Sequence, residues 1–294
     1  MKISFGIIVF NGNYVLEECI KSVYPYASQI LIAEGPVSYW QSMGYKTSFD
    51  GTNEIIDNYP DPENKIKIIH SQYSEKGDQA QSYMKFLNQD NDYIWNLDCD
   101  EIFKPEDIEK IIFLLETEKY TNVNFKSISF YGGFDRYITG FEENSPFVRI
   151  RKIYPGSYWK SHRPPVIGHV IKDILPEKEL NFNYLSDKYG IRMYHYSYVF
   201  PFQVNEKIKY YNDYVHMGGN ISNYFNSLYL PWVNGNDNQK LIIEKKYKGV
   251  HEYRPELRGE SFTSVFKGEH PKIILENMDK LKYKFNEQLK NFLQ

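Results

Sequence analysis

Apolar and polar positions alternate in blocks along the first 115 residues of the chain. Short runs that are almost entirely apolar predict strands buried on both faces, which is typical of a parallel sheet. These runs lie at residues 3–10, 29–33, 65–70 and 93–97. Each is followed by apolar residues at helical spacing, which predict helices at residues 13–23, 52–59, 77–87 and 105–115. Asn13 is the expected cap of the first helix, and Pro105 opens the last. This order predicts an α/β fold with a doubly wound, mostly parallel sheet.

The second half of the chain has a different pattern. Strands are expected at residues 126–131, 147–153 and 191–196, joined by loops rich in Gly and Pro. From Val204 the apolar spacing becomes helical and continues into a last helix that starts at Pro271. We therefore expect a helical C-terminal extension packed on the core.

Polar residues gather at the predicted strand ends. Glu34, the turns at 50–52 and 76–79, and the acidic pair Asp98 and Asp100 all follow strands. Ligands of open α/β sheets bind at the carboxyl ends of the strands. These separate segments therefore predict one shared site.

The acidic pair follows the fourth predicted strand, in the stretch Tyr-Ile-Trp-Asn-Leu-Asp-Cys-Asp-Glu at residues 93–101. Side chains alternate across a strand, so Asp98 and Asp100 are expected on the same side. Two carboxylates there suit a hard divalent cation. Such a cation would neutralise a diphosphate, which indicates a nucleotide-linked substrate.

Charge and cysteine content exclude several classes. The 35 Lys and Arg residues against 38 Asp and Glu give a net charge of −3, and no block of like charge suggests a nucleic-acid partner. Cys19 and Cys99 cannot form a disulfide framework and are expected to be reduced. The apolar run at the N-terminus is too short for a signal peptide or a transmembrane segment. A cytoplasmic protein is therefore expected.

Several motifs, in this order and at this spacing, resemble family 2 glycosyltransferases. They are Ile-Ile-Val-Phe-Asn at 7–11, the helix at 16–23, Leu-Ile-Ala-Glu at 31–34, Asp-Gly-Thr at 50–52 and Asp-Cys-Asp-Glu at 98–101. The resemblance covers roughly residues 3–115 and weakly the rest. It implies a GT-A-type, Rossmann-like core over residues 1–200, with a nucleotide-binding half at 1–115 and an acceptor half at 116–200, followed by the extension at 201–294.

The resemblance also implies an activity. A metal-dependent enzyme of this family would move a sugar from a nucleoside diphosphate donor, by default a UDP-sugar, to a glycan or another hydroxyl acceptor. Mn²⁺ or Mg²⁺ would stabilise the charge on the departing diphosphate. Asp100 is the expected direct metal ligand, Asp98 contacts the ribose or a metal-bound water, and His195 completes the coordination. The other nucleotide-binding candidates are Phe10, Asn11, Glu34, Asp50, Lys76 and Gln79.

Two departures from the family pattern concern this nucleotide site. About fourteen residues separate Glu34 from the Asp50 turn, which inserts a loop containing Tyr39, Trp40 and Tyr45. The role of Asp50 is therefore open. The helix before the metal motif lacks the usual Arg, so either Lys76 or a glutamine would take its place or the contact would be absent.

The second half offers candidates for the donor and the acceptor. Trp159 could stack on a sugar, and Arg163 or Lys160 could bind a phosphate, with His162 in the same segment, although two prolines equally suggest a stiff surface loop. Asp135 follows a Gly pair and is a candidate base for the acceptor hydroxyl, or a partner of Arg136. His195 could equally be a core histidine bonded to a carbonyl.

Other classes compete with the glycosyltransferase. A haloacid-dehalogenase-like phosphatase also uses Asp-x-Asp, but on its first strand. A sugar-nucleotide pyrophosphorylase would need a basic Gly-rich loop where residues 11–13 read Asn-Gly-Asn. A non-enzymatic carbohydrate-binding protein would use the 27 Tyr residues without a metal, although biased composition also explains them. Metal dependence of nucleoside diphosphate binding separates the transferase from such a protein.

Overall fold

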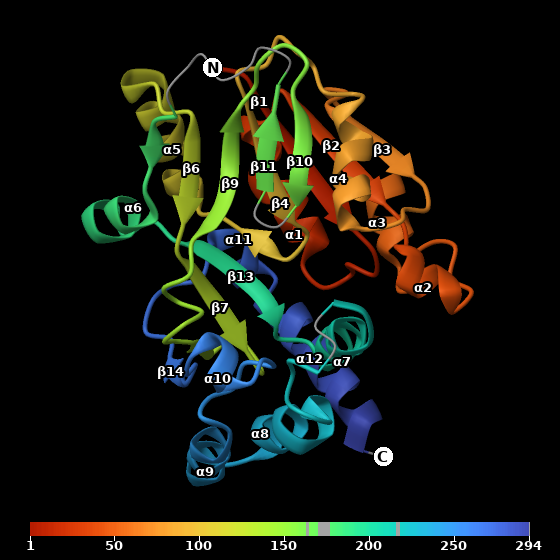
Figure 1. Ribbon diagram of the computed structural model, residues 1–294, viewed down its shortest axis with the longest axis vertical. Coiled ribbons are helices and arrows are strands. Elements are labelled where there is room, and N and C mark those ends of the chain that lie inside the picture. The colour runs from red at the N-terminus through yellow and green to blue at the C-terminus, as the bar shows by residue number, and fades with distance from the viewer. Residues whose placement is uncertain (163–164, 170–176, 216–217, 294) are drawn as a thin grey trace. The chain divides into compact units, whose positions relative to one another are not determined.

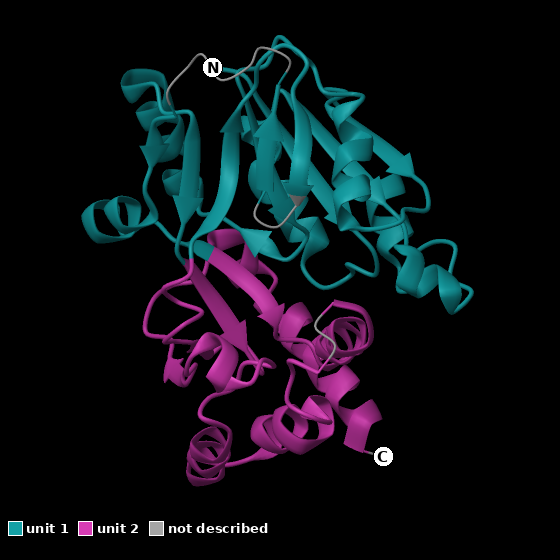
Figure 2. Cartoon of the chain, viewed as in Figure 1, with its two compact units in different colours: residues 1–126, 146–193 teal, residues 127–145, 194–294 magenta. Residues whose placement is uncertain are grey.

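The computed structural model describes residues 1–162, 165–169, 177–215 and 218–293 (Figure 1). The chain forms two compact units that interleave along the sequence (Figure 2). Unit 1 contains residues 1–126 and 146–193, and unit 2 contains residues 127–145 and 194–294. The sequence predicted a core at residues 1–200 and an extension at residues 201–294. This boundary differs from the boundaries of the two compact units, and the predicted division stays untested.

A seven-stranded sheet forms the centre of unit 1, with the strand order β12-β6-β9-β4-β1-β2-β3. The strands are β1 Ile3–Val9, β2 Gln29–Glu34, β3 Ile66–His70, β4 Tyr93–Asp98, β6 Asn122–Phe125, β9 Phe147–Lys152 and β12 Glu179–Leu180. The pairs β1–β2, β2–β3, β1–β4 and β12–β6 are parallel, whereas β9 is antiparallel to β4 and to β6. The predicted α/β class with a mostly parallel central sheet is confirmed.

Helices flank this sheet (Figure 1). They are α1 Leu16–Val23, α2 Ser38–Ser42, α3 Thr52–Asp57, α4 Lys76–Met84, α5 Pro105–Glu118 and α6 Phe182–Tyr189. A short 3-10 turn, Tyr24–Tyr26, follows α1. The hairpin of β10 Tyr158–His162 and β11 Pro165–Gly168 packs against α4. The two-residue strand β5 Glu101–Ile102 follows the acidic motif.

The position of each strand explains its composition. All seven residues of β1 are buried because β1 pairs with β2 on one side and β4 on the other. The edge strand β3 is only partly buried, since it has a neighbour on one side alone. In β1 even Gly6 is required by packing, because a Cβ there would lie 2.5 Å from the Tyr83 ring. The apolar runs of the sequence therefore mark the middle of the sheet.

Unit 2 contributes strands to a second sheet in the order β14-β8-β7-β13, in which the β14–β8 and β8–β7 pairs are antiparallel. These strands are β7 Ser127–Tyr131, β8 Arg136–Ile138, β13 Met193–Tyr198 and β14 Thr263–Val265. The helices of the unit are α7 Pro201–Tyr210, α8 Leu230–Asn234, α9 Asp237–Tyr247, α10 Pro255–Arg258, α11 Lys272–Glu276 and α12 Met278–Leu293, with π-helical turns at Tyr211–Val215 and Phe225–Tyr229. Its core is aromatic, with Tyr224, Tyr229 and Trp232 almost completely buried.

Three local expectations are wrong. Asn13 does not cap α1, whose N-cap is Val15 without a side-chain hydrogen bond. The side-chain amide of Asn13 donates to the Asp50 carbonyl instead. The last predicted helix is interrupted at Asn277, which ends α11 before α12 begins. The helical pattern after Val204 also contains β14. None of the helices in the described ranges is long and apolar enough to cross a bilayer.

Candidate active site

A buried arginine holds the acidic cluster at the end of β4. Arg149 on β9 is 6% exposed, and its Nε donates to Glu101 Oε2 at 2.8 Å while Nη2 contacts the other oxygen of Glu101. The same Nη2 donates to Asp98 Oδ2 at 3.0 Å. Burial alone would lower the pKa of Arg149, but the charges of Glu101 and Asp98 outweigh it and raise the pKa. Arg149 is therefore a fixed cation that orients Asp98.

This arrangement corrects the interpretation of the acidic stretch from strand alternation. Glu101 is 0% exposed and paired with Arg149. The strand ends at Asp98 and Asp100 lies in the following turn, so strand alternation does not place these two carboxylates. Both side chains are partly exposed, and Glu101 is the member of the cluster that faces the interior.

Cys99 lies within the acidic stretch, and Cys19 Sγ lies 3.8 Å from the Asp98 carbonyl. Burial, reinforced by the charge of Asp100, raises the pKa of Cys99 well above its usual value, and burial does the same for Cys19. Both are free thiols, as expected. Since metal binding needs the thiolate, these cysteines are poor ligands and the cluster offers oxygen atoms instead.

The turn after β1 is tied to the loop before α3. The Asp50 carboxylate accepts hydrogen bonds from the backbone amide of Asn13 at 2.9 Å and from the Thr52 hydroxyl at 2.6 Å. Thr52 Oγ1 in turn accepts from the backbone amide of Gly12. Asn11, buried with φ 53°, accepts from the Phe49 amide and donates its own amide to Ser48. Asp50 and Asn11 therefore shape the site, and their contact with a nucleotide stays a prediction.

Glu34 holds the end of the inserted loop by hydrogen bonds. It is 1% exposed and accepts hydrogen bonds from the Ser48 amide at 2.8 Å and from the Thr47 hydroxyl. His70 Nδ1 lies 3.0 Å from Glu34 and Nε2 lies 3.0 Å from Asp57. Although burial lowers the pKa of His70, these two hydrogen bonds raise it overall. The carboxylate of Glu34 is thus engaged within the protein, and its predicted role with a base or ribose stays untested.

The inserted loop forms an aromatic cluster with Phe10 at the end of β1. The Phe10 ring lies 5.6 Å from Trp40, 6.3 Å from Tyr45 and 6.2 Å from Phe49, and Tyr45 stacks on Phe49 at 4.5 Å. Phe49 is 47% exposed, so the cluster has a face open to solvent. The sequence placed these aromatic residues beside the nucleotide site but did not indicate that they pack together.

Gln79 bonds the backbone at the strand ends, and its predicted contact with a nucleotide stays untested. It is 3% exposed, and its Nε2 donates to the carbonyls of Val9 at 3.0 Å and Ala33 at 2.9 Å. Val9 ends β1 and Ala33 is the residue before the last of β2, and the Val9 carbonyl also accepts from the Gly35 amide at 3.0 Å. Gln79 therefore holds the strand ends at their spacing, while Lys76 begins α4.

Replacement of Gln79 by leucine is expected to lower the free energy of unfolding by about 1–3 kcal/mol, because the hydrogen bonds from Gln79 Nε2 to the Val9 and Ala33 carbonyls would be lost. Urea unfolding measures this loss. Gln72 is exposed, so Gln72→Leu is the matched control and should change stability by less than about 0.5 kcal/mol. Equal effects of the two substitutions would refute the assignment of Gln79 as a brace.

The second predicted binding segment is only partly described. Trp159 lies on β10 with 7% exposure, and its Nε1 donates to the Tyr83 hydroxyl at 3.0 Å, so most of the ring packs inside unit 1. Its stacking on a sugar stays a prediction. His162 ends β10, and Arg163 lies outside the described residues.

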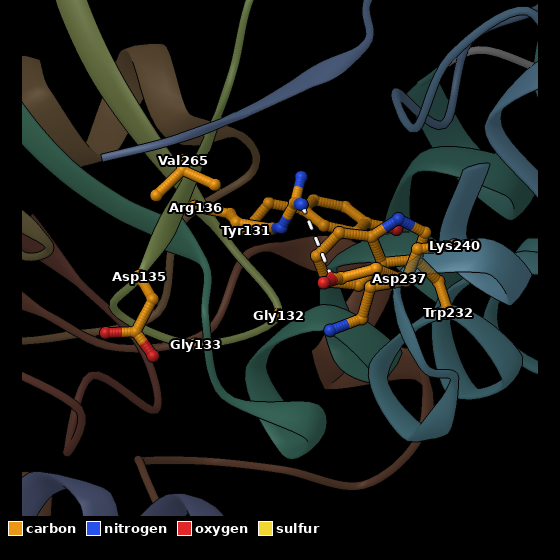
Figure 3. Close-up of a pocket in the computed structure, with 9 residues that line it drawn as sticks. All are labelled: Tyr131, Gly132, Gly133, Asp135, Arg136, Trp232, Asp237, Lys240 and Val265. Carbon is orange, nitrogen blue, oxygen red and sulfur yellow. Dashed lines mark ion pairs between the residues drawn. The ribbon is translucent and has the colours of Figure 1, made fainter. Parts of the chain in front are cut away.

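The remaining candidates lie in unit 2. Asp135 is exposed and lines a cavity of about 270 Å³ with Tyr131, Gly132, Gly133, Arg136, Trp232, Asp237, Lys240 and Val265. Figure 3 shows Arg136 facing Asp237, 3.5 Å away, with the Asp135 carboxylate apart from this pair. Asp135 is thus not the partner of Arg136. His195 lies on β13 and is buried among polar groups of the same unit.

The predicted metal site can be compared with the side chains that are available to bind a cation. Among the described residues, no group of three or more His, Cys, Asp or Glu side chains is arranged to hold a metal ion. Mg²⁺ commonly binds to proteins through one or two carboxylates together with substrate phosphates. Asp98 and Asp100 fit that pattern, in which phosphate groups of a substrate supply the remaining oxygen ligands of the cation.

A comparison with protein families confirms the predicted resemblance. Residues 47–171 match the family model described as Glycosyl transferase family 2. The match contains the Asp50 turn and the Asp98–Asp100 motif, while the likeness of residues 3–46 to the family stays a prediction. No curated protein matches the chain in a sequence search.

Solved structures show a partial likeness at low identity. Staphylococcus aureus TarS 1–349 is 14% identical with a TM-score of 0.35, over 52% of this chain and 47% of that one. The complex of the same protein with UDP-GlcNAc is 14% identical with a TM-score of 0.33, over 44% and 35%. A 4-diphosphocytidyl-2C-methyl-D-erythritol synthase from Anaerococcus prevotii is 13% identical with a TM-score of 0.31, over 51% and 70%. The chain thus spans about half the length of the TarS fragment that it matches.

Proposed function

We propose that the protein is a metal-dependent glycosyltransferase that transfers a sugar from a nucleoside diphosphate donor to a hydroxyl acceptor. A UDP-sugar is the default donor. The observation that carries the proposal is the pair of partly exposed carboxylates, Asp98 and Asp100, at the end of β4 within the family 2 match. The carboxyl end of a strand in an α/β sheet is where such ligands bind.

The residues around this pair suit a diphosphate. Bound Mn²⁺ or Mg²⁺ would neutralise the charge that develops on the leaving nucleoside diphosphate. Arg149 fixes one oxygen of Asp98 at 3.0 Å, which limits the rotation of that carboxylate. The side chain of Asp98 remains 33% exposed, so it can still contact a ligand. Asp100 is the proposed direct ligand of the cation.

The aromatic cluster of Phe10, Trp40, Tyr45 and Phe49 is the proposed contact of the nucleobase. It follows β1, which neighbours β4 in the sheet, and Phe49 presents an exposed ring. Stacking of a base on an aromatic side chain contributes about 1–3 kcal/mol. Such stacking tolerates different bases. The choice of UDP therefore rests on the family resemblance and not on these residues.

The acceptor is proposed to bind in the cavity of unit 2 that Asp135 lines. Arg136 pairs with Asp237 and with Thr263 Oγ1 at 3.0 Å, and Lys240 lies over the Trp232 ring at 4.6 Å. These charges are paired within the protein, which suits a neutral polyhydroxyl ligand such as a sugar. Gly132, with φ 61°, keeps the cavity open, because a Cβ there would lie 2.5 Å from Trp232.

Asp135→Asn is expected to lower kcat about 100-fold or more, because a general base contributes 10²–10⁴-fold in typical enzymes. Asp135 is exposed, so the melting temperature should stay within about 2 °C of wild type. Transfer to an acceptor is the quantity to measure. Asp279, exposed on α12, provides the matched control in Asp279→Asn. A kcat equal to that of the control would remove Asp135 from the mechanism.

A panel of nucleoside diphosphate sugars tests the proposed function without knowledge of the acceptor, since water can replace it. We expect release of free nucleoside diphosphate in Mn²⁺, its loss in EDTA and its recovery when Mn²⁺ is restored. If the protein bound glycans in EDTA and released no diphosphate from any donor, it would be a carbohydrate-binding protein and the proposal would fail.

A further inference from the structure

Unit 2 contains a buried group of polar side chains around His195. Ser129 on β7 lies at its centre with 0% exposure. Its hydroxyl oxygen lies 3.1 Å from Glu142 Oε1, 3.0 Å from the Ser127 hydroxyl and 3.4 Å from His195 Nδ1. The last distance is at the long end for a hydrogen bond. Three partners around one hydroxyl leave little freedom in how the protons are arranged.

The arrangement follows from counting protons. A serine hydroxyl has one proton to donate and two lone pairs to accept with. Glu142 is a carboxylate and can only accept, so Ser129 donates its proton to Glu142. Ser129 must then accept from both Ser127 and His195. The hydrogen bond to His195 therefore requires a proton on Nδ1 of that ring.

Glu142 is held as a carboxylate from its other side. Its Oε2 lies 3.6 Å from His251 Nε2, and His251 Nδ1 lies 3.1 Å from Glu252. Burial would raise the pKa of Glu142, but the hydrogen bond and charge of His251 lower it to about 2. Burial also lowers the pKa of His251, and the charge of Glu252 together with the bond to Glu142 raises it overall. The acceptor that fixes Ser129 therefore stays ionised near neutral pH.

A second buried histidine of the same unit has the opposite arrangement. His270 Nε2 lies 2.9 Å from the Phe134 carbonyl, which can only accept, so this nitrogen carries the proton. His270 Nδ1 accepts from the Tyr196 hydroxyl at 2.9 Å. The hydrogen bonds thus assign opposite tautomers to His195 and His270.

We infer that Ser129 and Glu142 are positioning residues that keep the neutral ring of His195 protonated on Nδ1 and direct its lone pair through Nε2. In this form a histidine can bind a divalent cation or accept a proton from a hydroxyl group. The inference concerns the ring itself and does not depend on glycosyl transfer, so it can succeed or fail independently of the proposed function.

Nitrogen NMR of the full-length protein, with ¹⁵N-labelled histidine, tests the inference directly. His195 and His270 are assigned from the signals lost in His195→Asn and His270→Asn. At a pH where the rings are neutral, we expect a protonated Nδ1 and an unprotonated Nε2 for His195, and the reverse for His270. A wild-type His195 with its proton on Nε2 would overturn the inference.

Three serine variants test what fixes the tautomer. Ser129→Ala should convert His195 to a mixture of tautomers while His270 keeps its own, which also shows that the unit is folded. Ser129→Thr restores the hydroxyl and should restore the Nδ1 proton. Ser127→Ala is the matched control and should leave His195 unchanged, since Ser129 still donates to Glu142. A His195 tautomer that is unaffected in Ser129→Ala would contradict the role of Ser129.

Added Mn²⁺ separates the two partners that could use the lone pair. Broadening of the His195 ring signals at lower Mn²⁺ concentration than those of His270 would identify a cation, and an absence of broadening would exclude Mn²⁺ as the partner of the lone pair. Both results keep the inferred tautomer, which the first experiment decides.

Discussion

Replacement of Asp100 by asparagine is expected to lower turnover of the sugar donor about 100- to 1,000-fold and to leave the protein folded. The substitution keeps the size of the side chain but removes the charge proposed to hold the cation. Asp100 lies in the turn after β4 and is partly exposed, so its replacement removes no packed core group. Initial rates of diphosphate release, with the melting temperature measured on the same sample, give both quantities.

The matched control is Asp90→Asn. Asp90 is exposed in the loop before β4 and belongs to the same unit. The control should keep the wild-type rate and the wild-type dependence on Mn²⁺ concentration. If Asp100→Asn also turned over the donor at the wild-type rate, the metal would have to be held elsewhere.

The second large effect is expected from Arg149→Met, which should lower the free energy of unfolding by about 3–5 kcal/mol. The substitution leaves Glu101, which is 0% exposed, as a buried charge without its cation. It also releases Asp98 from its fixed orientation, so any folded fraction should turn over the donor more slowly. Chemical denaturation at several pH values, followed by fluorescence, measures the loss of stability.

Two comparisons identify the cause. Arg149→Met combined with Glu101→Leu removes both buried charges and should recover part of the stability, because a buried ion pair can often be replaced by apolar side chains without loss. Arg151→Met, on the same strand, removes a cation whose partner Glu177 is exposed, and should cost less. If the double variant were no more stable than Arg149→Met, the unpaired charge of Glu101 would not explain the loss.

The sheet of unit 1 could be predicted because the strands in its middle are buried on both faces. The apolar runs at 3–10 and 93–97 became β1 and β4, which lie side by side in the middle of the sheet. Short strands were missed for the opposite reason. β8 and β14 have three residues each and are only partly buried, so their sequences show no clear period.

The candidate site could be located from the sequence but its internal contacts could not. Asp98 and Asp100 were indicated by the strand before them, whereas Arg149, 51 residues away from Asp98, is brought there by the antiparallel pairing of β9 with β4. An arginine in a strand with apolar neighbours was the available signal for a buried cation. The bonds from Gln79 to the carbonyls of two strands could not be predicted, because no sequence pattern indicates such contacts.

A crystal soaked with Mn²⁺ and UDP tests the central claim most directly, by anomalous diffraction from the manganese. The account predicts an anomalous peak bonded to Asp100, close to Asp98 and to both phosphates of UDP. A crystal in which UDP is bound but no manganese peak lies at Asp98 and Asp100 would contradict it.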